Sequence, residues 1–89
     1  MKGATERQLE VLVMLDDLTD ISPPSIRELA KALGMTSTNS VYEHLNRLKK
    51  KGLVRRGRDR TTRAWGLTEL GRAAASAKRA ADAYEEVSA

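Results

Sequence analysis

A cluster of short or flat polar side chains early in the segment 36–52 gives the sequence its clearest potential for chemistry. Thr38, Asn39, Tyr42 and Glu43 share one side of a helix if the segment is helical, because residues three or four positions apart lie on the same face. Each of these groups can donate or accept hydrogen bonds, as contact with the edge of a nucleic-acid base requires. An ordinary amphipathic surface helix would show the same pattern, so the segment alone leaves both interpretations open.

The apolar residues between them predict the element that would position these side chains. Val41, Leu45 and Leu48 recur at i, i+4 and i+7, which is the spacing of one apolar stripe on a helix. Ser37 is suited to the N-cap of that helix, and Gly52 is suited to the position that follows its last turn. The sequence therefore predicts a helix with one side for a core and an opposite side of hydrogen-bonding groups.

Positive charge is concentrated in the residues that follow. The net charge is +4 over 89 residues, but residues 46–66 carry nine Lys or Arg and one acidic residue, a net +8. Residues 1–45 sum to −3 and residues 67–89 to −1. Solvated charged faces usually mix signs, so this block favours a polyanionic partner, although cations late in a helix also complement its dipole. The candidate phosphate-binding residues are Arg47, Lys50, Lys51, Arg55, Arg56, Arg58, Arg60 and Arg63.

Composition limits the other classes of function. Eighty-nine residues, 40% of them hydrophobic, suit one small globular domain. Cysteine is absent and His44 is the one histidine, so the sequence predicts no metal site, no cofactor and no catalytic constellation. We interpret His44 as a packed or capping residue. No apolar run approaches the roughly 20 residues that span a bilayer, and the N-terminus lacks a signal-peptide core, so we expect a cytoplasmic protein.

Two further helices are predicted before residue 36. Thr5 with Gln8, and Ser25 with Glu28, form capping-box patterns that mark their starts. The first helix has a wide apolar arc, which indicates a central element contacted from more than one side. Gly34 supplies a tight turn between the second and third helices, so these two form a helix-turn-helix. The apolar stripes are Val11, Met14, Leu15 and Leu18 in the first helix, and Ile26, Leu29, Ala30 and Leu33 in the second.

A β-hairpin is predicted after the third helix. Residues 53–56 and 61–67 are strand-like, and residues 57–60 between them are turn-like, although Gly66 weakens the second strand. Trp65 is expected to pack the hairpin onto the helices, and stacking on a base is the less favoured alternative. The predicted fold is mainly α with a small β-hairpin: a winged helix-turn-helix of three helices plus a wing, followed by a C-terminal helix.

The C-terminal helix carries a seam that needs a partner. Thr68 can cap a helix that runs to about residue 87, with apolar residues at a and d positions over nearly three heptads. The seam either pairs with a second copy of the chain, which we favour, or folds back on the first helix. We therefore divide the chain into a winged helix-turn-helix domain at 1–67 and a dimerisation element at 68–89. The seam consists of Leu70, Ala73, Ala77, Ala80, Tyr84 and Val87.

Three stretches of the chain resemble the N-terminal DNA-binding domain of the LexA repressor. They are Met-Lys-x-x-Thr-x-Arg-Gln-x-Glu-Val from Met1, Pro-Pro-Ser-Ile-Arg-Glu-Leu-Ala-Lys-Ala-Leu-Gly from Pro23, and Ser-Thr-Asn-Ser-Val-Tyr-Glu-His-Leu from Ser37. The match covers about residues 1–56 and implies a winged helix-turn-helix whose third helix reads the major groove. From Ala64 onward, Leu-Thr-Glu-Leu-Gly-Arg resembles the close of MarR- and PadR-type winged helices, whose C-terminal helix is used in dimers.

The resemblance also implies roles for particular residues. In the LexA family a serine, an asparagine and a glutamate near the start of the third helix contact bases, and Ser37, Asn39 and Glu43 occupy these positions. Two departures fall on the same helix: Tyr42 stands where LexA has a second glutamate, and Ser40 replaces a small apolar residue. LexA continues into a self-cleaving serine-lysine protease domain, for which 89 residues leave no room.

We therefore predict sequence-specific binding of double-stranded DNA by a transcriptional regulator of repressor type. Asn39 is suited to adenine and Glu43 to the amino group of cytosine, while Tyr42 either contacts a thymine methyl or a phosphate, or packs partly against the wing. The alternatives are a winged-helix module for protein–protein interaction and a subunit of a nucleic-acid enzyme. The candidate base-reading residues are Ser37, Thr38, Asn39, Tyr42 and Glu43.

Overall fold

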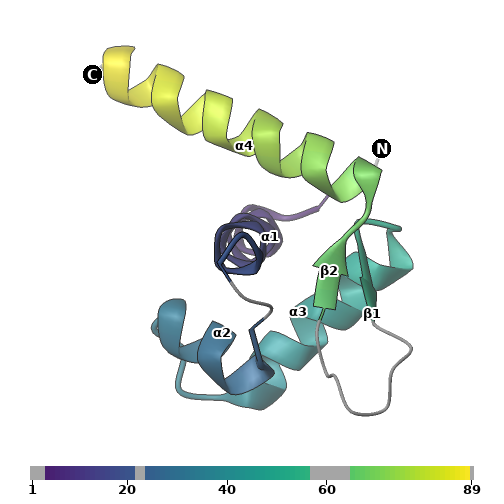
Figure 1. Cartoon of the computed structure of the whole chain (residues 1–89). Coiled ribbons are helices and arrows are strands. Elements are labelled where there is room, and N and C mark those ends of the chain that lie inside the picture. Colours follow the sequence, from purple (N-terminus) through teal and green to yellow (C-terminus); the bar gives the residue numbers. More distant parts are fainter. Residues whose placement is uncertain (1–3, 22–23, 57–64, 89) are drawn as a thin grey trace.

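The computed structural model of the protein describes residues 4–21, 24–56 and 65–88. Within these ranges it has four helices and a two-stranded antiparallel sheet, in the order expected from the sequence (Figure 1). The mainly α fold with a hairpin is therefore confirmed. The elements are α1 (Glu6–Thr19), α2 (Ile26–Ala32), α3 (Thr38–Lys50), β1 (Val54–Arg56), β2 (Trp65–Leu67) and α4 (Glu69–Ser88).

The first three helices begin at the predicted caps. The Thr5 hydroxyl accepts the Gln8 backbone N–H at 3.2 Å, and the Gln8 side chain accepts the Thr5 N–H at 3.2 Å. Ser25 and Glu28 form the same reciprocal pair, at 3.1 and 3.0 Å. Such capping boxes satisfy two N–H groups that have no partner inside the helix. At the other end, α2 and α3 are followed by Gly34 with φ 70° and by Gly52 with φ 75°, the left-handed backbone that favours glycine.

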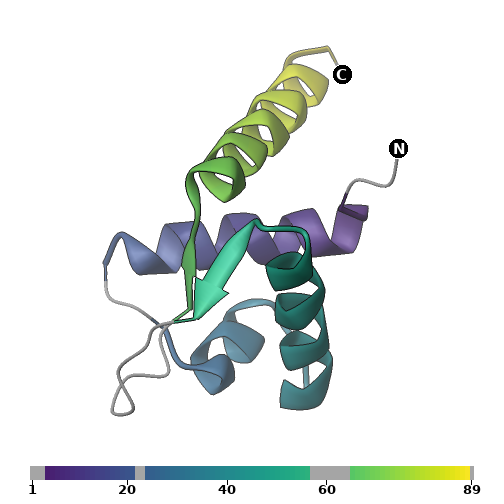
Figure 2. The same cartoon turned by 90° about the vertical axis from the view of Figure 1, so that its right-hand side faces the viewer.

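Helix α1 is the centre of the molecule. Figures 1 and 2 show α4 on one side of it, with α2 and α3 on the other. Its residues Val11, Leu12 and Leu15 are fully buried and form one core with apolar residues of α2, α3, the hairpin and Ala75 of α4. The wide apolar arc of α1 therefore does serve contacts on several sides.

The described part of the hairpin consists of two short strands. Strands β1 and β2 each have three residues, paired so that Val54 lies opposite Leu67 and Arg56 opposite Trp65. The predicted turn at 57–60 and the start of the predicted second strand lie outside the described residues. Trp65 is 2% exposed, so its expected packing is confirmed, and its ring offers no open face on which a base could stack.

Thr68 attaches α4 to the rest of the fold. Its hydroxyl accepts the Gly71 N–H at 3.0 Å, as a helix cap does, and donates to the Gly52 carbonyl oxygen at 2.6 Å. Its backbone N–H also donates to the Leu53 carbonyl oxygen at 3.1 Å. The start of α4 is therefore fixed to the turn between α3 and β1.

Farther along α4, charged side chains bind it to α1. Arg79 donates to Asp16 at 2.7 Å and also to Asp17, and Lys78 pairs with Glu6 and, at 3.0 Å, with Asp82. These carboxylates favour the charged forms of their partners, so Glu6 and then Asp82 raise the pKa of Lys78, and Asp16 and then Asp17 raise that of Arg79.

The face of α4 that meets α1 is not the predicted seam. It includes Gly71 and Ala75, both buried, whereas Leu70 is 59% exposed and Tyr84 is 74% exposed. Ala73, Ala77 and Ala80 are exposed as well. The alternative that the seam folds back on α1 is therefore wrong. Gly71 and Ala75 face the rest of the domain, so the side chains of Leu70 and Tyr84 point outward. The side chain of Val87 lies outside the described residues.

Candidate nucleic-acid interface

Helix α3 separates its apolar and polar side chains as predicted. Val41, Leu45 and Leu48 are fully buried against the core. This anchoring leaves the opposite face to solvent: Thr38, Asn39, Tyr42, Glu43, Arg47, Lys49 and Lys50 are all exposed.

A groove joins this polar face to the start of α2. It has a volume of about 580 Å³. Three of the five candidate base-reading residues line it from α3, so the structure brings these side chains together on one concave surface. The lining residues are Ser25, Ile26, Arg27, Thr38, Asn39 and Tyr42.

The other two candidates lie beside the groove. Ser37 is exposed and is the N-cap of α3, and its hydroxyl accepts the Ser40 N–H at 3.3 Å. Its hydroxyl proton can still be donated to an acceptor. Glu43 is exposed one position beyond Tyr42, so its carboxylate is available as a hydrogen-bond acceptor on the same side of α3.

The predicted phosphate-binding residues do not all have the same surroundings. Arg47 and Lys50 are exposed in the last turn of α3. Lys51 is half-buried, and its ammonium group donates to the Gln8 side-chain oxygen at 2.8 Å, which links the end of α3 to α1. Lys51 therefore has a structural role that the sequence did not reveal.

The two arginines of β1 point to opposite sides of the hairpin. Successive side chains of a strand alternate between faces, and Arg56 lies opposite Trp65 on the side that meets α3. The guanidinium carbon of Arg56 is 5.7 Å from the centroid of the Trp65 ring. Arg55 is exposed on the outer face, beside Gly66. The remaining candidates, Arg58, Arg60 and Arg63, lie outside the described residues.

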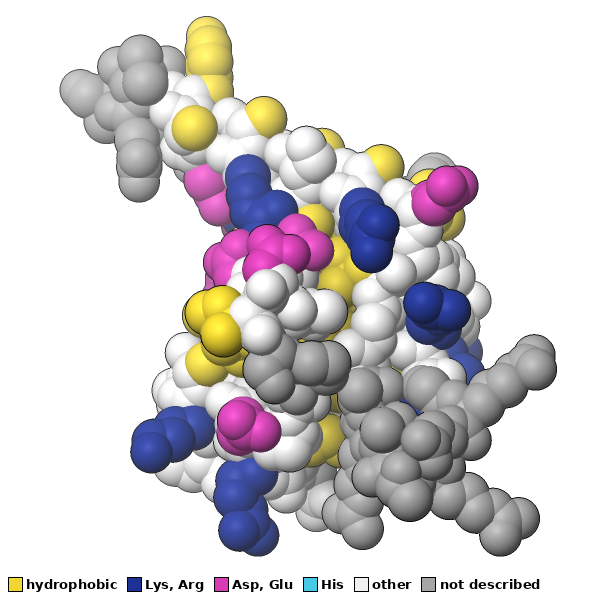
Figure 3. Space-filling view, viewed as in Figure 1, with side chains coloured by type: hydrophobic (Ala, Val, Ile, Leu, Met, Phe, Trp, Pro, Cys, Tyr) yellow, Lys and Arg dark blue, Asp and Glu magenta, His cyan; other side chains and the backbone are white. Residues whose placement is uncertain are grey.

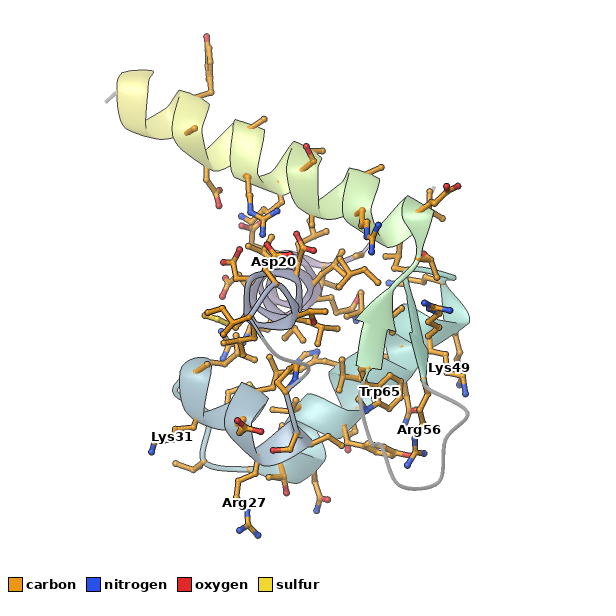
Figure 4. All side chains as sticks on the ribbon, in the orientation of Figure 1. Asp20, Arg27, Lys31, Lys49, Arg56 and Trp65 are labelled. Carbon is orange, nitrogen blue, oxygen red and sulfur yellow. The ribbon has the colours of Figure 1, made fainter. Side chains whose placement is uncertain are left out.

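Two cations of α2 were not among the candidates predicted from the sequence. Arg27 lines the groove, and Figure 4 shows Arg27 and Lys31 projecting from α2, away from the side of α1 that α4 covers. Figure 3 shows that acidic side chains gather instead at the end of α1 beneath α4. Arg27 stands in the first turn of α2, the helix before α3, and this position could have indicated it as a candidate cation. At the same end of α2, the Ser25 backbone N–H and then its hydroxyl hold the pKa of Glu28 below its ordinary value.

Tyr42 is partly packed against the wing and partly open to solvent. Its ring lies edge-on to Trp65, with centroids 6.0 Å apart, and it is still 36% exposed. It is therefore packed against the wing strand and accessible from the groove. His44, on the same helix, is half-buried, and its Nδ1 atom has no hydrogen-bond partner within the described part of the chain.

Other kinds of site find no support in the described ranges. No three His, Asp or Glu side chains there come together in a way that could hold a metal ion. None of the helices described is both long enough and apolar enough to cross a membrane.

The fold and the surface together define a winged helix-turn-helix whose third helix presents a polar face above a groove. A sequence profile of the LexA DNA binding domain matches residues 1–64. The chain therefore belongs to the family of LexA DNA-binding domains, as its sequence motifs suggested.

Individual relatives agree with this family. The LexA repressor of Clostridium novyi is 39% identical over 57 residues, which are 62% of this chain and 28% of the relative. That of an Exiguobacterium species is 41% identical over 58 residues, with 63% of this chain and 28% of the relative covered. The matched region is thus little more than a quarter of the length of either repressor.

Several similar solved structures are of a different regulator. MepR of Staphylococcus aureus, a transcription regulator of the multidrug efflux pump MepA, has a TM-score of 0.77 and 27% identity over 93% of this chain and 62% of its own. MepR in complex with DNA has a TM-score of 0.78 and 25% identity over 92% of this chain and 59% of its own. The similarity extends over most of this chain, in agreement with the MarR-type resemblance of its C-terminal part.

Proposed function

We propose that this chain binds double-stranded DNA sequence-specifically and acts as a transcriptional regulator of repressor type. The observation that carries the proposal is the division of α3: three fully buried apolar residues fix its orientation, and the groove-lining face carries Thr38, Asn39 and Tyr42. A helix held in this way can place short polar side chains in the major groove. The LexA repressors that it matches, and the MepR–DNA complex that it resembles, support the same function.

In this proposal Asn39 forms a bidentate pair with adenine and Glu43 accepts from the amino group of cytosine. Ser37 and Thr38 contribute further hydrogen bonds near the start of α3, and Tyr42 contacts a thymine methyl or a phosphate. Phosphates are bound by Arg47 and Lys50 and also by Arg27, which lines the groove. The other predicted phosphate contacts are Lys51, Arg55, Arg56, Arg58, Arg60 and Arg63.

The proposed function is tested by an unbiased selection of duplexes bound by the whole chain, followed by binding assays across a series of salt concentrations. We expect one enriched sequence, and an affinity that falls steeply as salt rises, because bound cations release counterions from DNA. A protein-interaction module would give no enriched sequence, almost no binding and little dependence on salt. That result would reject the proposal.

We further propose that two copies pair through α4. Its outward face is apolar from Leu70 to Tyr84, a span of ~21 Å along the helix, and both end residues are largely exposed. One recognition helix covers only a few base pairs, and two copies would double the site. The alanines between the ends allow close approach of two helices but bury little area each, so we expect a modest affinity.

Sedimentation of the wild type and of an Ala77→Glu, Ala80→Glu variant tests the dimer. Two carboxylates buried in the interface should convert a dimer into folded monomers. Ala83→Glu is the control, because residue 83 is exposed and lies about 100° around the helix from the middle of the seam. A wild-type chain that remains monomeric at high micromolar concentration, with and without DNA, would contradict this proposal.

A further inference from the structure

One aromatic side chain connects the recognition helix to the wing. Trp65 of β2 contacts the ring of Tyr42 of α3 edge-on, with an interplanar angle of 79°. The guanidinium of Arg56, from β1, lies over the same Trp65 ring. Trp65 itself is buried, whereas Tyr42 and Arg56 are exposed. Two solvent-facing side chains from different elements therefore share one buried support.

The pairing of the two strands fixes this support in place. Arg56 and Trp65 are cross-strand partners, and Val54 and Leu67 form the next pair on the same face. Val54 is 2% exposed and Leu67 is 7% exposed, so this end of the hairpin face is part of the core. The Trp65 ring is thus held by the core on one side and reaches α3 on the other (Figure 4).

Filling space does not explain why this residue is tryptophan. Its Nε1 atom is buried and has no acceptor among the residues that the structure describes. A buried N–H without a partner is unfavourable, and leucine would fill the core without it. An indole offers instead a large π face for a cation and a ring for edge-to-face contact, which are the two contacts observed.

We propose that Trp65 is a positioning residue for DNA sequence discrimination. It holds Tyr42 at the edge of the groove and Arg56 beside it, so that the recognition helix and the wing engage DNA as one unit. The inference rests on the proposed function and takes contact with a base as the role of Tyr42. Loss of the ring leaves both side chains free to adopt other rotamers. The variant should then discriminate less between DNA sequences and also bind DNA more weakly.

The test compares Trp65→Leu with the wild type, at a temperature where circular dichroism shows both to be folded. The measured quantity is the ratio of affinities for the selected duplex and for duplexes changed at single positions. We expect this ratio to fall about three- to tenfold. The loss should be concentrated at the base pair that Tyr42→Ala also relaxes, and Trp65→Phe, which keeps a ring, should restore most of it.

Two controls separate positioning from stability. Val54→Ala truncates an equally buried residue on the same hairpin face, and it should lower the unfolding temperature without changing the affinity ratio. In a double-mutant cycle, Tyr42→Ala and Arg56→Ala should be non-additive in the wild type and additive in the Trp65→Leu background. If Trp65→Leu does not fold, Tyr42→Ala and Arg56→Ala should still be non-additive in the wild type and in Trp65→Phe, which keeps a ring, and additive effects in either background would overturn the inference.

The outcomes are distinguishable from failure of the proposed function. A wild type that selects a sequence, together with a folded Trp65→Leu variant of unchanged affinity ratio, overturns the inference alone. Additive effects of Tyr42→Ala and Arg56→Ala in the wild type also overturn it. A wild type that discriminates between no duplexes rejects the proposed function, and the inference with it.

Discussion

Gly71 of α4 lies against the backbone of Leu53, so close that a Cβ atom at position 71 would come within 1.9 Å of the Leu53 carbonyl oxygen. This contact lies next to the hydrogen bond from the Thr68 N–H to the same oxygen. The first turn of α4 can therefore approach the loop before β1 only because residue 71 has no side chain. The direction of α4, and with it the outward position of its apolar seam, depends on this approach.

We expect Gly71→Ala to destabilise the fold by about 1–3 kcal/mol, although alanine has the higher helix propensity. The added methyl group meets backbone rather than a flexible side chain, so the start of α4 must shift. The measurement is urea unfolding followed by circular dichroism. Gly66→Ala is the control, since its Cβ would meet only the Arg55 side chain at 3.9 Å. Equal stability of Gly71→Ala and wild type would show that α4 is not held by this contact.

Asn39→Ala should weaken binding to the selected duplex by about 1–3 kcal/mol and relax the requirement at one base pair. The reason is that Asn39 is exposed, lines the groove and stands early on the polar face of α3. Competition with single-position variants of the duplex measures the effect. If affinity for selected and random duplexes fell equally, Asn39 would position the protein without reading a base.

Arg47→Ala and Lys50→Ala should weaken binding to selected and random DNA alike. Each lost phosphate contact should reduce the slope of log affinity against log salt by roughly 0.9. Arg72→Ala removes the same charge from an exposed site on α4, outside α3 and outside the groove lining, and should leave the slope unchanged. Equal slopes for all three variants and the wild type would remove these residues from the interface.

Lys78 should stabilise the fold in a manner that depends on pH. Glu6 and then Asp82 raise its pKa above the ordinary value of 10.5. A lysine whose pKa is raised by folding stabilises the native state fully below its unfolded pKa, and this contribution is lost as pH rises through the folded value. The difference in unfolding free energy between wild type and Lys78→Met should therefore be constant from about pH 8 to 10 and then shrink.

Lys78→Arg provides the control for this pH series, because arginine stays charged throughout. The difference in unfolding free energy between Lys78→Arg and Lys78→Met should remain constant over the same pH range. If the difference in unfolding free energy between wild type and Lys78→Met does not shrink above pH 10.5, Lys78 is not paired in solution.

The local structure of the helices could be predicted because short-range physics determines it. Thr5 and Ser25 meet their capping partners three residues away, and Gly34 and Gly52 take the backbone conformation that ends a helix. The division of α3 into a buried and an exposed side follows in the same way from the spacing of its apolar residues. The groove face of the candidate site was predictable for this reason.

The residues that pair in long-range contacts could mostly not be predicted. Alanines occur on both sides of α4, so its sequence does not tell which side meets α1, whereas the contact at Gly71 and the ion pairs of Lys78 and Arg79 do. The bond between Lys51 and Gln8 joins residues 43 positions apart. The sharing of Trp65 by Tyr42 and Arg56 likewise depends on three separate elements meeting.

Reading of DNA sequence by α3 can be measured as an affinity ratio. The ratio compares binding of the whole chain to its selected duplex with binding to a shuffled duplex of the same composition. Measured by fluorescence anisotropy at roughly 0.15 M salt, the selected duplex should bind more tightly by a factor of ~10³ or more. Asn39→Ala should reduce that factor, whereas Arg72→Ala should not. A ratio near one would mean that α3 does not read sequence, because equal binding of any sequence requires only the basic residues.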